Sequence, residues 1–215
     1  MSTVAVFGAT GRTGAHIVDQ ALTRGYRVIA IARHPAALGG IAAKWSASGR
    51  LRTATADVRD PASVDAAVHE SEAVISAIAS AGRHPHQLFS AGTHNIVNSL
   101  RHQRISRFIC VSSRGVNFRD PALPLIYRAV IRPLFLREVY ADMQAMEAIV
   151  RESDRQWTLV RAARLTDARA RGDYRIEDGH NPRGGWTLSR ADLAAFVLDQ
   201  LDTPEWIRRT PTLAY

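Results

Sequence analysis

The stretch Thr3–Gly14, with the sequence TVAVFGATGRTG, constrains the fold of this chain more than any other stretch. A short apolar run rich in β-branched residues comes first, and glycines follow at positions 8, 11 and 14. From Arg12 to Arg24 apolar residues recur at the spacing of one helix face. The order strand, glycine turn, helix is the context in which such glycines predict a dinucleotide-binding site.

Each glycine of this turn has a predicted task. Gly8 allows the tight turn, Gly11 lets the backbone approach a pyrophosphate, and Gly14 lets the helix pack close to the strand. The N–H groups at the start of the helix, near Arg12 and Thr13, lack helical partners and carry partial positive charge, so they attract a phosphate. The alternative is an ordinary glycine-rich turn before a helix.

The spacing G-x-x-G-x-x-G differs from the G-x-G-x-x-G of the standard dinucleotide fingerprint. It resembles the spacing in the short-chain and extended dehydrogenase superfamily, especially its atypical members. That superfamily contains reductases, epimerases and redox-sensing regulators. The motif therefore predicts a nicotinamide dinucleotide more strongly than it predicts a reaction.

Length and composition fit one such domain. The chain has 215 residues, of which 46% are hydrophobic, so it can bury a sizeable core and is too apolar to be disordered. No apolar run reaches the length of a membrane span, and no signal-peptide pattern precedes the first strand. The single cysteine, Cys110, excludes an internal disulfide framework. We expect a single NAD(P)-binding domain over residues 1–215, in the cytoplasm, as a monomer or homodimer.

The formal net charge of +8 raises the question of a nucleic-acid partner. The arginines are scattered, however, and Lys44 is the only lysine. No basic run interleaved with aromatic residues is present. We attribute the charge to an arginine-rich surface and to attraction for a phosphorylated cofactor, and expect no nucleic-acid partner.

Arg33 indicates which dinucleotide is bound. It follows a predicted second strand, Arg27–Ala32, whose end meets the adenosine ribose in a dinucleotide fold. An acidic residue there binds the 2′-hydroxyl of NAD, whereas a guanidinium binds a phosphate through two parallel hydrogen bonds. Arg33 therefore predicts NADP(H). The alternative is a solvated surface arginine.

Two more predicted strands, Leu51–Ala56 and Ala73–Ile78, end beside the same site. An aspartate after the first is a candidate ligand for the adenine amino group, whereas Asp60 is predicted to cap a helix. Small residues at the end of the second allow close approach to a cofactor. The strand-end residues expected beside the cofactor are Asp57, Val58, Ala77, Ile78 and Ala79.

A predicted fifth strand, Arg107–Val111, delivers Ser112 to the carboxyl edge of the sheet. Ligands of open parallel sheets bind beyond these carboxyl ends. Ser112 is therefore a candidate catalytic residue that hydrogen-bonds the substrate or the nicotinamide. The alternative is a serine that caps a turn. Cys110 is expected to be buried and inert.

A predicted sixth strand, Trp157–Val160, delivers Arg164 to the same edge. We expect Arg164 to face the substrate as a second candidate catalytic residue that supplies a fixed positive charge. The alternative is an ion pair with Asp167 or Asp142, since surface ion pairs are common and individually weak.

The segment Asn117–Val139 has the character of an insertion, with prolines, leucines and arginines intermixed. We expect a lid over a hydrophobic substrate or a subunit contact. A basic amphipathic helix on a membrane is less favoured because prolines interrupt the segment. His84 and His86 suggest a metal, but no third ligand lies nearby, so a polar loop and no metal are expected.

Four motifs carry a closer resemblance: GATGRTG, THNIVNSL leading to RFICVSS, RESDRQWTLVRAARLTD, and the tail YRIEDG…TLSRADLAAFVLDQL. With them the chain resembles the biliverdin reductase B and flavin reductase family, close to the NmrA-like atypical dehydrogenases. The resemblance implies a Rossmann-type α/β fold, a doubly wound, mostly parallel sheet with helices on both faces. It also implies an NADPH-dependent reductase that passes hydride to a flavin, a quinone or another flat conjugated acceptor.

The resemblance also implies site residues. The residues implied are Thr10, Gly11, Arg12 and Thr13 for the pyrophosphate, Arg33 for the 2′-phosphate, Asp57 and Val58 for adenine, and Ser112 as the strand-end serine. One departure concerns the acceptor. The family's biliverdin-reducing members have a histidine where this chain has Arg164, which argues against biliverdin and favours a more acidic acceptor.

The tyrosine–lysine pair of ordinary short-chain dehydrogenases is absent. That mechanism requires a lysine four residues after a tyrosine, and Tyr140 is followed by Gln144, Tyr127 by Ile131. Alcohol oxidation by that acid–base route is therefore excluded. A reductase remains the main hypothesis, beside an NADP-sensing regulator without activity. A dinucleotide-dependent epimerase or isomerase is the weakest of the three.

Overall fold

Apolar segments of the sequence form the buried central strands of one sheet. The computed structural model describes residues 2–80, 82, 84–117, 120 and 136–215. Strands β1 (Thr3–Phe7) and β2 (Arg27–Ala32) are buried from their second residue onward. Parallel strands that are covered by helices on both faces require such continuous apolar runs. Strand β3 (Leu51–Thr55) is more exposed because it forms an edge of the sheet.

The main sheet has eight strands in the order β3-β2-β1-β4-β5-β6-β10-β8. All neighbouring pairs are parallel except β10 and β8. The remaining strands of this sheet are β4 (Ala73–Ser76), β5 (Arg107–Ser113), β6 (Gln156–Ala162), β8 (Arg175–Asp178) and β10 (Pro211–Ala214). The order reverses between β1 and β4, which is the switch point where open α/β sheets bind ligands. The predicted Rossmann-type fold is confirmed.

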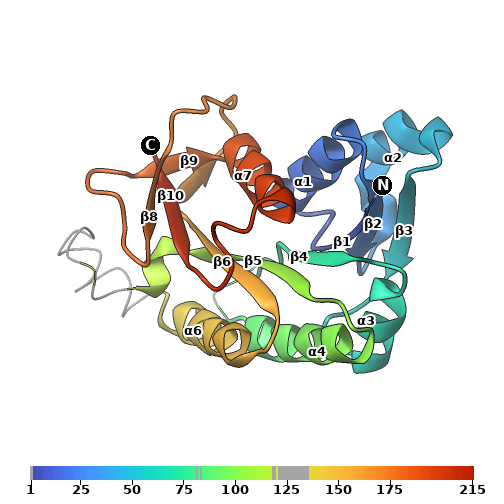
Figure 1. Cartoon of the computed structure of the whole chain (residues 1–215), viewed down its shortest axis with the longest axis horizontal. Coiled ribbons are helices and arrows are strands. Elements are labelled where there is room, and N and C mark those ends of the chain that lie inside the picture. Colours follow the sequence, from blue (N-terminus) through green and yellow to red (C-terminus); the bar gives the residue numbers. More distant parts are fainter. Residues whose placement is uncertain (1, 81, 83, 118–119, 121–135) are drawn as a thin grey trace.

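Helices cover both faces of the sheet (Figure 1). Helices α1 (Arg12–Thr23) and α7 (Arg190–Asp202) pack together on one face. The other face is covered by α3 (Pro61–Val68), α4 (Leu88–His102) and α6 (Arg137–Glu152).

Alternate residues of each strand supply the two cores. In β1, Val4 and Val6 pack toward α1 and α7, whereas Ala5 and Phe7 pack toward α3, α4 and α6. This division follows from the two-residue period of a strand, which points successive side chains to opposite faces.

Side chains cap the first turns of two of the helices, and the sequence analysis predicts the first of these caps. Asp60 accepts a hydrogen bond from the backbone N–H of Ala62 at the start of α3. Ser189 accepts one from Asp192 N–H at the start of α7, and its own hydroxyl donates to the Asp192 carboxylate. The Tyr215 hydroxyl donates a further hydrogen bond to the Asp192 carboxylate, so the same carboxylate also holds Tyr215 against the start of α7.

Four elements are not predicted by the sequence analysis, namely α2, β7, β9 and β10. Helix α2 (Gly39–Trp45) buries none of its residues, so its sequence has no need of an apolar periodicity that would predict a helix. Trp45 anchors it by donating a hydrogen bond to Asp19, 2.7 Å from indole nitrogen to carboxylate oxygen. Strands β7 (Arg164–Thr166) and β9 (Thr187–Ser189) form a separate two-stranded parallel sheet.

The predicted insertion Asn117–Val139 falls mostly on residues 118–119 and 121–135, which lie outside the described residues. Its last three residues belong to the first turn of α6. The lid or subunit contact therefore stays a prediction. In the described part of the chain, no helix has the length and apolar character needed to cross a membrane.

Candidate functional site

The glycine turn is packed so closely that two of its glycines have no substitute. Gly8 has a φ of +73°, and a β-carbon there would lie 2.5 Å from the carbonyl oxygen of Ala77. A β-carbon on Gly14 would lie 2.0 Å from the carbonyl oxygen of Gly8. The turn therefore joins the end of β1, the start of α1 and the end of β4 in one close contact.

The start of α1 is open to an anion. Gly11 is the N-cap residue, no side chain caps the helix within the described residues, and the first turn contains no acidic side chain. The unpaired N–H groups and the helix dipole together favour a phosphate. The side chain of Arg12 forms an ion pair with Asp167, which follows β7. Arg12 thus links the glycine turn to the loop that follows β7.

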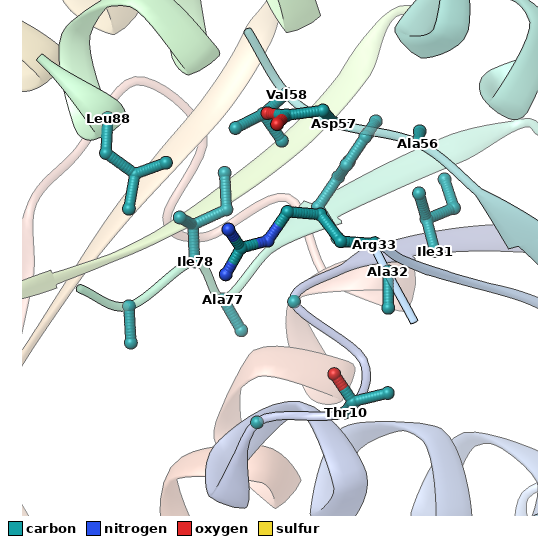
Figure 2. A pocket seen from close by; sticks show the side chains of 14 residues that line it. Thr10, Ile31, Ala32, Arg33, Ala56, Asp57, Val58, Ala77, Ile78 and Leu88 are labelled. Atoms are coloured by element: carbon teal, nitrogen blue, oxygen red, sulfur yellow. The ribbon is translucent and has the colours of Figure 1, made fainter. Parts of the chain in front are cut away.

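A first pocket of about 200 Å³ lies over the carboxyl ends of β1, β2, β3 and β4. Figure 2 shows its lining, with Thr10 at the start of α1 and Asp57 and Val58 across the pocket. The predicted cofactor residues that line it are Gly8, Thr10, Gly11, Arg33, Asp57, Val58, Ala77, Ile78 and Ala79. Arg12, Thr13 and Gly14 do not line this pocket.

Arg33 points its guanidinium into the first pocket (Figure 2). No carboxylate lies within ion-pair distance of it among the described residues. Asp57 and Val58 are held in place by hydrogen bonds. The Asp57 carboxylate accepts one from Arg59 N–H at 3.0 Å, and the Val58 carbonyl accepts one from the Asn95 amide at 2.9 Å. The pocket thus combines a fixed rim with a cation that pairs with no carboxylate of the described residues.

A second pocket of about 320 Å³ adjoins the first. The two pockets share Ala77, Ile78 and Ala79, so the end of β4 forms the floor between them. Apolar side chains make up most of the second lining, namely Phe89, Val111, Leu136, Val139, Met143 and Leu165. The polar side chains in the lining are Thr13, Ser80 and Ser112, and none of the described lining residues is ionisable.

Ser112 belongs to a buried polar network that the sequence did not reveal. Its hydroxyl donates a hydrogen bond to Glu147 at 2.7 Å. Arg161 grips the same carboxylate with two nitrogens, at 2.9 and 2.6 Å, and Arg151 donates to it at 2.6 Å. Glu147 is fully buried on α6. Burial raises the pKa of Glu147, but the hydrogen bonds and charge of Arg161, with Ser112 and Arg151, bring it below its ordinary value.

Only part of this network has a signal in the sequence. Glu147 and Arg151 lie four residues apart on one helix, a spacing typical of ion pairs. Arg161 reaches Glu147 only because β6 pairs with β5 in a register that places Arg161 beside Ser112. The strand register is a property of the tertiary structure, so the sequence alone does not indicate that Glu147 and Arg161 belong to the site.

Arg164, which the sequence analysis expects to face the substrate, is not in the described lining of either pocket. Arg164 begins β7 and its side chain is exposed, whereas the next residue, Leu165, lines the second pocket. Successive strand residues point to opposite sides, which explains why the leucine and not the arginine faces inward. The alternative ion pair is also absent among the described residues. Asp167 pairs with Arg12 and Arg190, and Asp142 accepts hydrogen bonds from the first turn of α4.

The histidine loop and the cysteine occupy different environments. His84 pairs with Glu138 at 2.7 Å, and both side chains are exposed. Within the described ranges no three potential metal ligands are grouped together. Cys110 is fully buried in β5, as predicted, and burial raises the pKa of its thiol to about 12.

A protein-family model described as NAD(P)H-binding matches residues 8–204 of the chain. The chain belongs to this NAD(P)H-binding family. The match covers the glycine turn and, except for Phe7, the lining of both pockets, and it confirms the dinucleotide that the glycine motif predicts.

Two relatives resemble the chain in sequence. A chloroplast protein of Arabidopsis thaliana is 31% identical over 180 residues, which are 81% of this chain and 63% of that protein. The YwnB protein of Bacillus subtilis is 25% identical over 217 residues, 94% of this chain and 93% of YwnB. The chain thus spans less than two thirds of the Arabidopsis protein and most of YwnB.

Several solved structures share the fold. A short-chain dehydrogenase/reductase of Veillonella parvula in complex with NADP has a TM-score of 0.83 and 17% identity, and the match covers 100% of this chain and 94% of that one. ChuY of Escherichia coli O157:H7, described as an anaerobilin reductase, has a TM-score of 0.78 and 23% identity, with 99% and 97% covered. At these identities the likeness establishes the Rossmann-type fold alone.

Proposed function

We propose that the protein is an NADPH-dependent reductase that transfers hydride to a flat conjugated acceptor, such as a flavin or a quinone. One observation carries the proposal. An apolar pocket adjoins the dinucleotide pocket across the end of β4, and its described lining contains no ionisable side chain. Such a pocket suits a planar ring and offers no acid or base for alcohol chemistry.

The residues of the first pocket fit a phosphorylated dinucleotide. The glycine turn and the open start of α1 receive the pyrophosphate, and Thr10 and Gly11 line the same surface. Arg33 receives the 2′-phosphate, which favours NADPH over NADH. Asp57 and Val58 border the adenine. Thr13 lies in the second pocket, on the side where the nicotinamide would be.

The chemistry places few demands on the chain. A bound reduced nicotinamide supplies the hydride. The small side chains of Ala77 and Ala79 permit close approach of the nicotinamide and the acceptor. The acceptor's own heteroatoms take their proton from water. Tyr140 and Gln144 occupy the spacing of the ordinary catalytic pair, but Gln144 is engaged with the Val116 carbonyl.

The named activity of one structural neighbour agrees with this proposal. ChuY is described as an anaerobilin reductase, so at least one protein of this fold is named as a reductase. We extend only the reaction class to the present chain. Arg164 lies outside the apolar pocket, so the acceptor is selected by the shape and apolarity of the lining rather than by that charge.

The test is a screen of NADPH oxidation with FMN, riboflavin, quinones and biliverdin as acceptors. A reductase oxidises NADPH with at least one flavin or quinone. Val111→Phe should fill the second pocket and abolish this activity while NADP⁺ binding persists. Ile41→Phe, a similar enlargement away from both pockets, is the matched control. Tight binding of NADP⁺ with no oxidation by any acceptor would instead favour the NADP-sensing regulator.

A further inference from the structure

The orientation of one hydroxyl in the second pocket is fixed by the carboxylate beneath it. Glu147 is fully buried and held by Arg161 through two nitrogens, with Arg151 as a third donor. Arg161 is itself buried and donates to the carbonyl of Gly179 as well. A carboxylate gripped in this way is ionised and can only accept hydrogen bonds.

The hydroxyl hydrogen of Ser112 is therefore held by the Glu147 carboxylate. A serine hydroxyl has one hydrogen to donate and two lone pairs to accept with. Ser112 donates its hydrogen to Glu147 at 2.7 Å. Toward the second pocket, which Ser112 also lines, only its lone pairs remain. In that apolar lining Ser112 is a hydrogen-bond acceptor and not a donor.

A dihydronicotinamide presents one group that suits such an acceptor. The amide nitrogen of its carboxamide carries two N–H donors, and the ring itself carries none. We propose, on the basis of the proposed function, that Ser112 accepts a hydrogen bond from the nicotinamide carboxamide and that Glu147 is the positioning residue that imposes this direction. The pair thereby selects the rotation of the carboxamide and holds the ring against the acceptor.

This assignment changes the role expected of Ser112. A hydroxyl whose hydrogen is held by an ionised carboxylate does not protonate an acceptor. The arrangement also explains why a carboxylate is buried beneath the strand ends of β5 and β6, where replacement by an apolar residue would leave Arg161 unpaired.

The experiment compares two oxidised cofactors that need no acceptor substrate. One is NADP⁺, and the other is its 3-acetylpyridine analogue, in which a methyl group replaces the amide nitrogen and removes both donors. Binding of each is measured by calorimetry to the wild-type protein and to variants. We expect the wild type to bind NADP⁺ about five- to tenfold more tightly than the analogue, the value of one hydrogen bond.

Ser112→Ala should reduce the preference for NADP⁺ over the analogue to less than about twofold. Ser112→Thr, which has a hydroxyl at the same position, should retain the preference. Ser113→Ala is the matched control and should keep the full preference, since Ser113 caps the following turn and does not line the pocket. A Ser112→Ala protein that retains the wild-type preference overturns the proposal. If the wild-type protein binds neither NADP⁺ nor the analogue, that result would instead refute the proposed function.

Glu147 is tested with two variants. Glu147→Gln replaces an acceptor by a group that also donates, and Glu147→Asp withdraws the carboxylate by one methylene. Both should lower the preference for NADP⁺ over the analogue, as Ser112→Ala does. A purely structural role predicts a lower melting temperature with the cofactor preference unchanged. That result in whichever variant remains folded by circular dichroism would remove Glu147 from the proposal.

Discussion

Replacing Arg33 with alanine should change which dinucleotide the protein prefers. The guanidinium points into the first pocket, beside the end of β2, where the ribose of a dinucleotide lies (Figure 2). Among the described residues it has no carboxylate partner. The substitution therefore removes the proposed ligand of the 2′-phosphate without leaving a buried charge unpaired.

The size of the effect follows from the exposure of this side chain. A hydrogen bond to a charged group contributes about 1.5–3 kcal/mol, whereas exposed ion pairs contribute about 0.2–1 kcal/mol. Arg33 is an exposed residue that lines an open pocket, so solvent screening places the value near the lower end of the first range. We expect a loss of about 1.4 kcal/mol, which is about tenfold in affinity.

The assay is calorimetric titration of NADP⁺ and NAD⁺ into the wild type, Arg33→Ala and Arg27→Ala. The affinity for NADP⁺ should fall about tenfold in Arg33→Ala, while the affinity for NAD⁺ stays within about twofold. Arg27 is an exposed arginine at the opposite end of the same strand and should leave both affinities unchanged. Added salt should weaken the NADP⁺ preference of the wild type. Equal affinities for the two dinucleotides in the wild type would refute the reasoning.

Four further predictions follow from the site and the core. Arg164→Ala should change the ratio of KM for FMN to KM for riboflavin by less than about twofold, since Arg164 lies outside the pocket; a selective rise for FMN would contradict this. Gly14→Ala should lower the melting temperature or abolish folding, because its β-carbon would lie 2.0 Å from the carbonyl oxygen of Gly8. Asp192 has a pKa below the ordinary 3.8: burial opposes this, but hydrogen bonds from Tyr215, the Ser189 hydroxyl and backbone N–H groups lower it. The ionised Asp192 therefore stabilises the fold fully above its pKa in the unfolded chain, and this stabilisation is lost as the pH falls through its lower pKa in the folded protein. Asp192→Asn should flatten the acid side of a plot of the free energy of unfolding against pH. Cys110 should react with a thiol reagent at pH 8 only as the protein unfolds; rapid labelling of the native protein would refute its burial.

Local patterns in the sequence were sufficient for the fold and for the dinucleotide pocket. The glycine turn, the apolar strands and the caps at Asp60 and Ser189 are short-range features, and each depends on neighbours a few residues away. The residues expected around the adenosine end come from the ends of consecutive strands. Because parallel strands bring their carboxyl ends to one edge, their order in the sequence is enough to place Arg33 and Asp57 in one pocket.

The polar centre of the second pocket was decided by the tertiary structure. Ser112, Glu147 and Arg161 lie on β5, α6 and β6, and they meet only through strand register and the packing of a helix across two strands. Whether Arg164 or Leu165 faces the pocket depends on the register in which β7 pairs with β9. A shift of that register by one residue would turn the arginine inward and the leucine outward. A sequence specifies which residues can form a strand or bear a charge, but long-range pairing determines which of them face the same cavity.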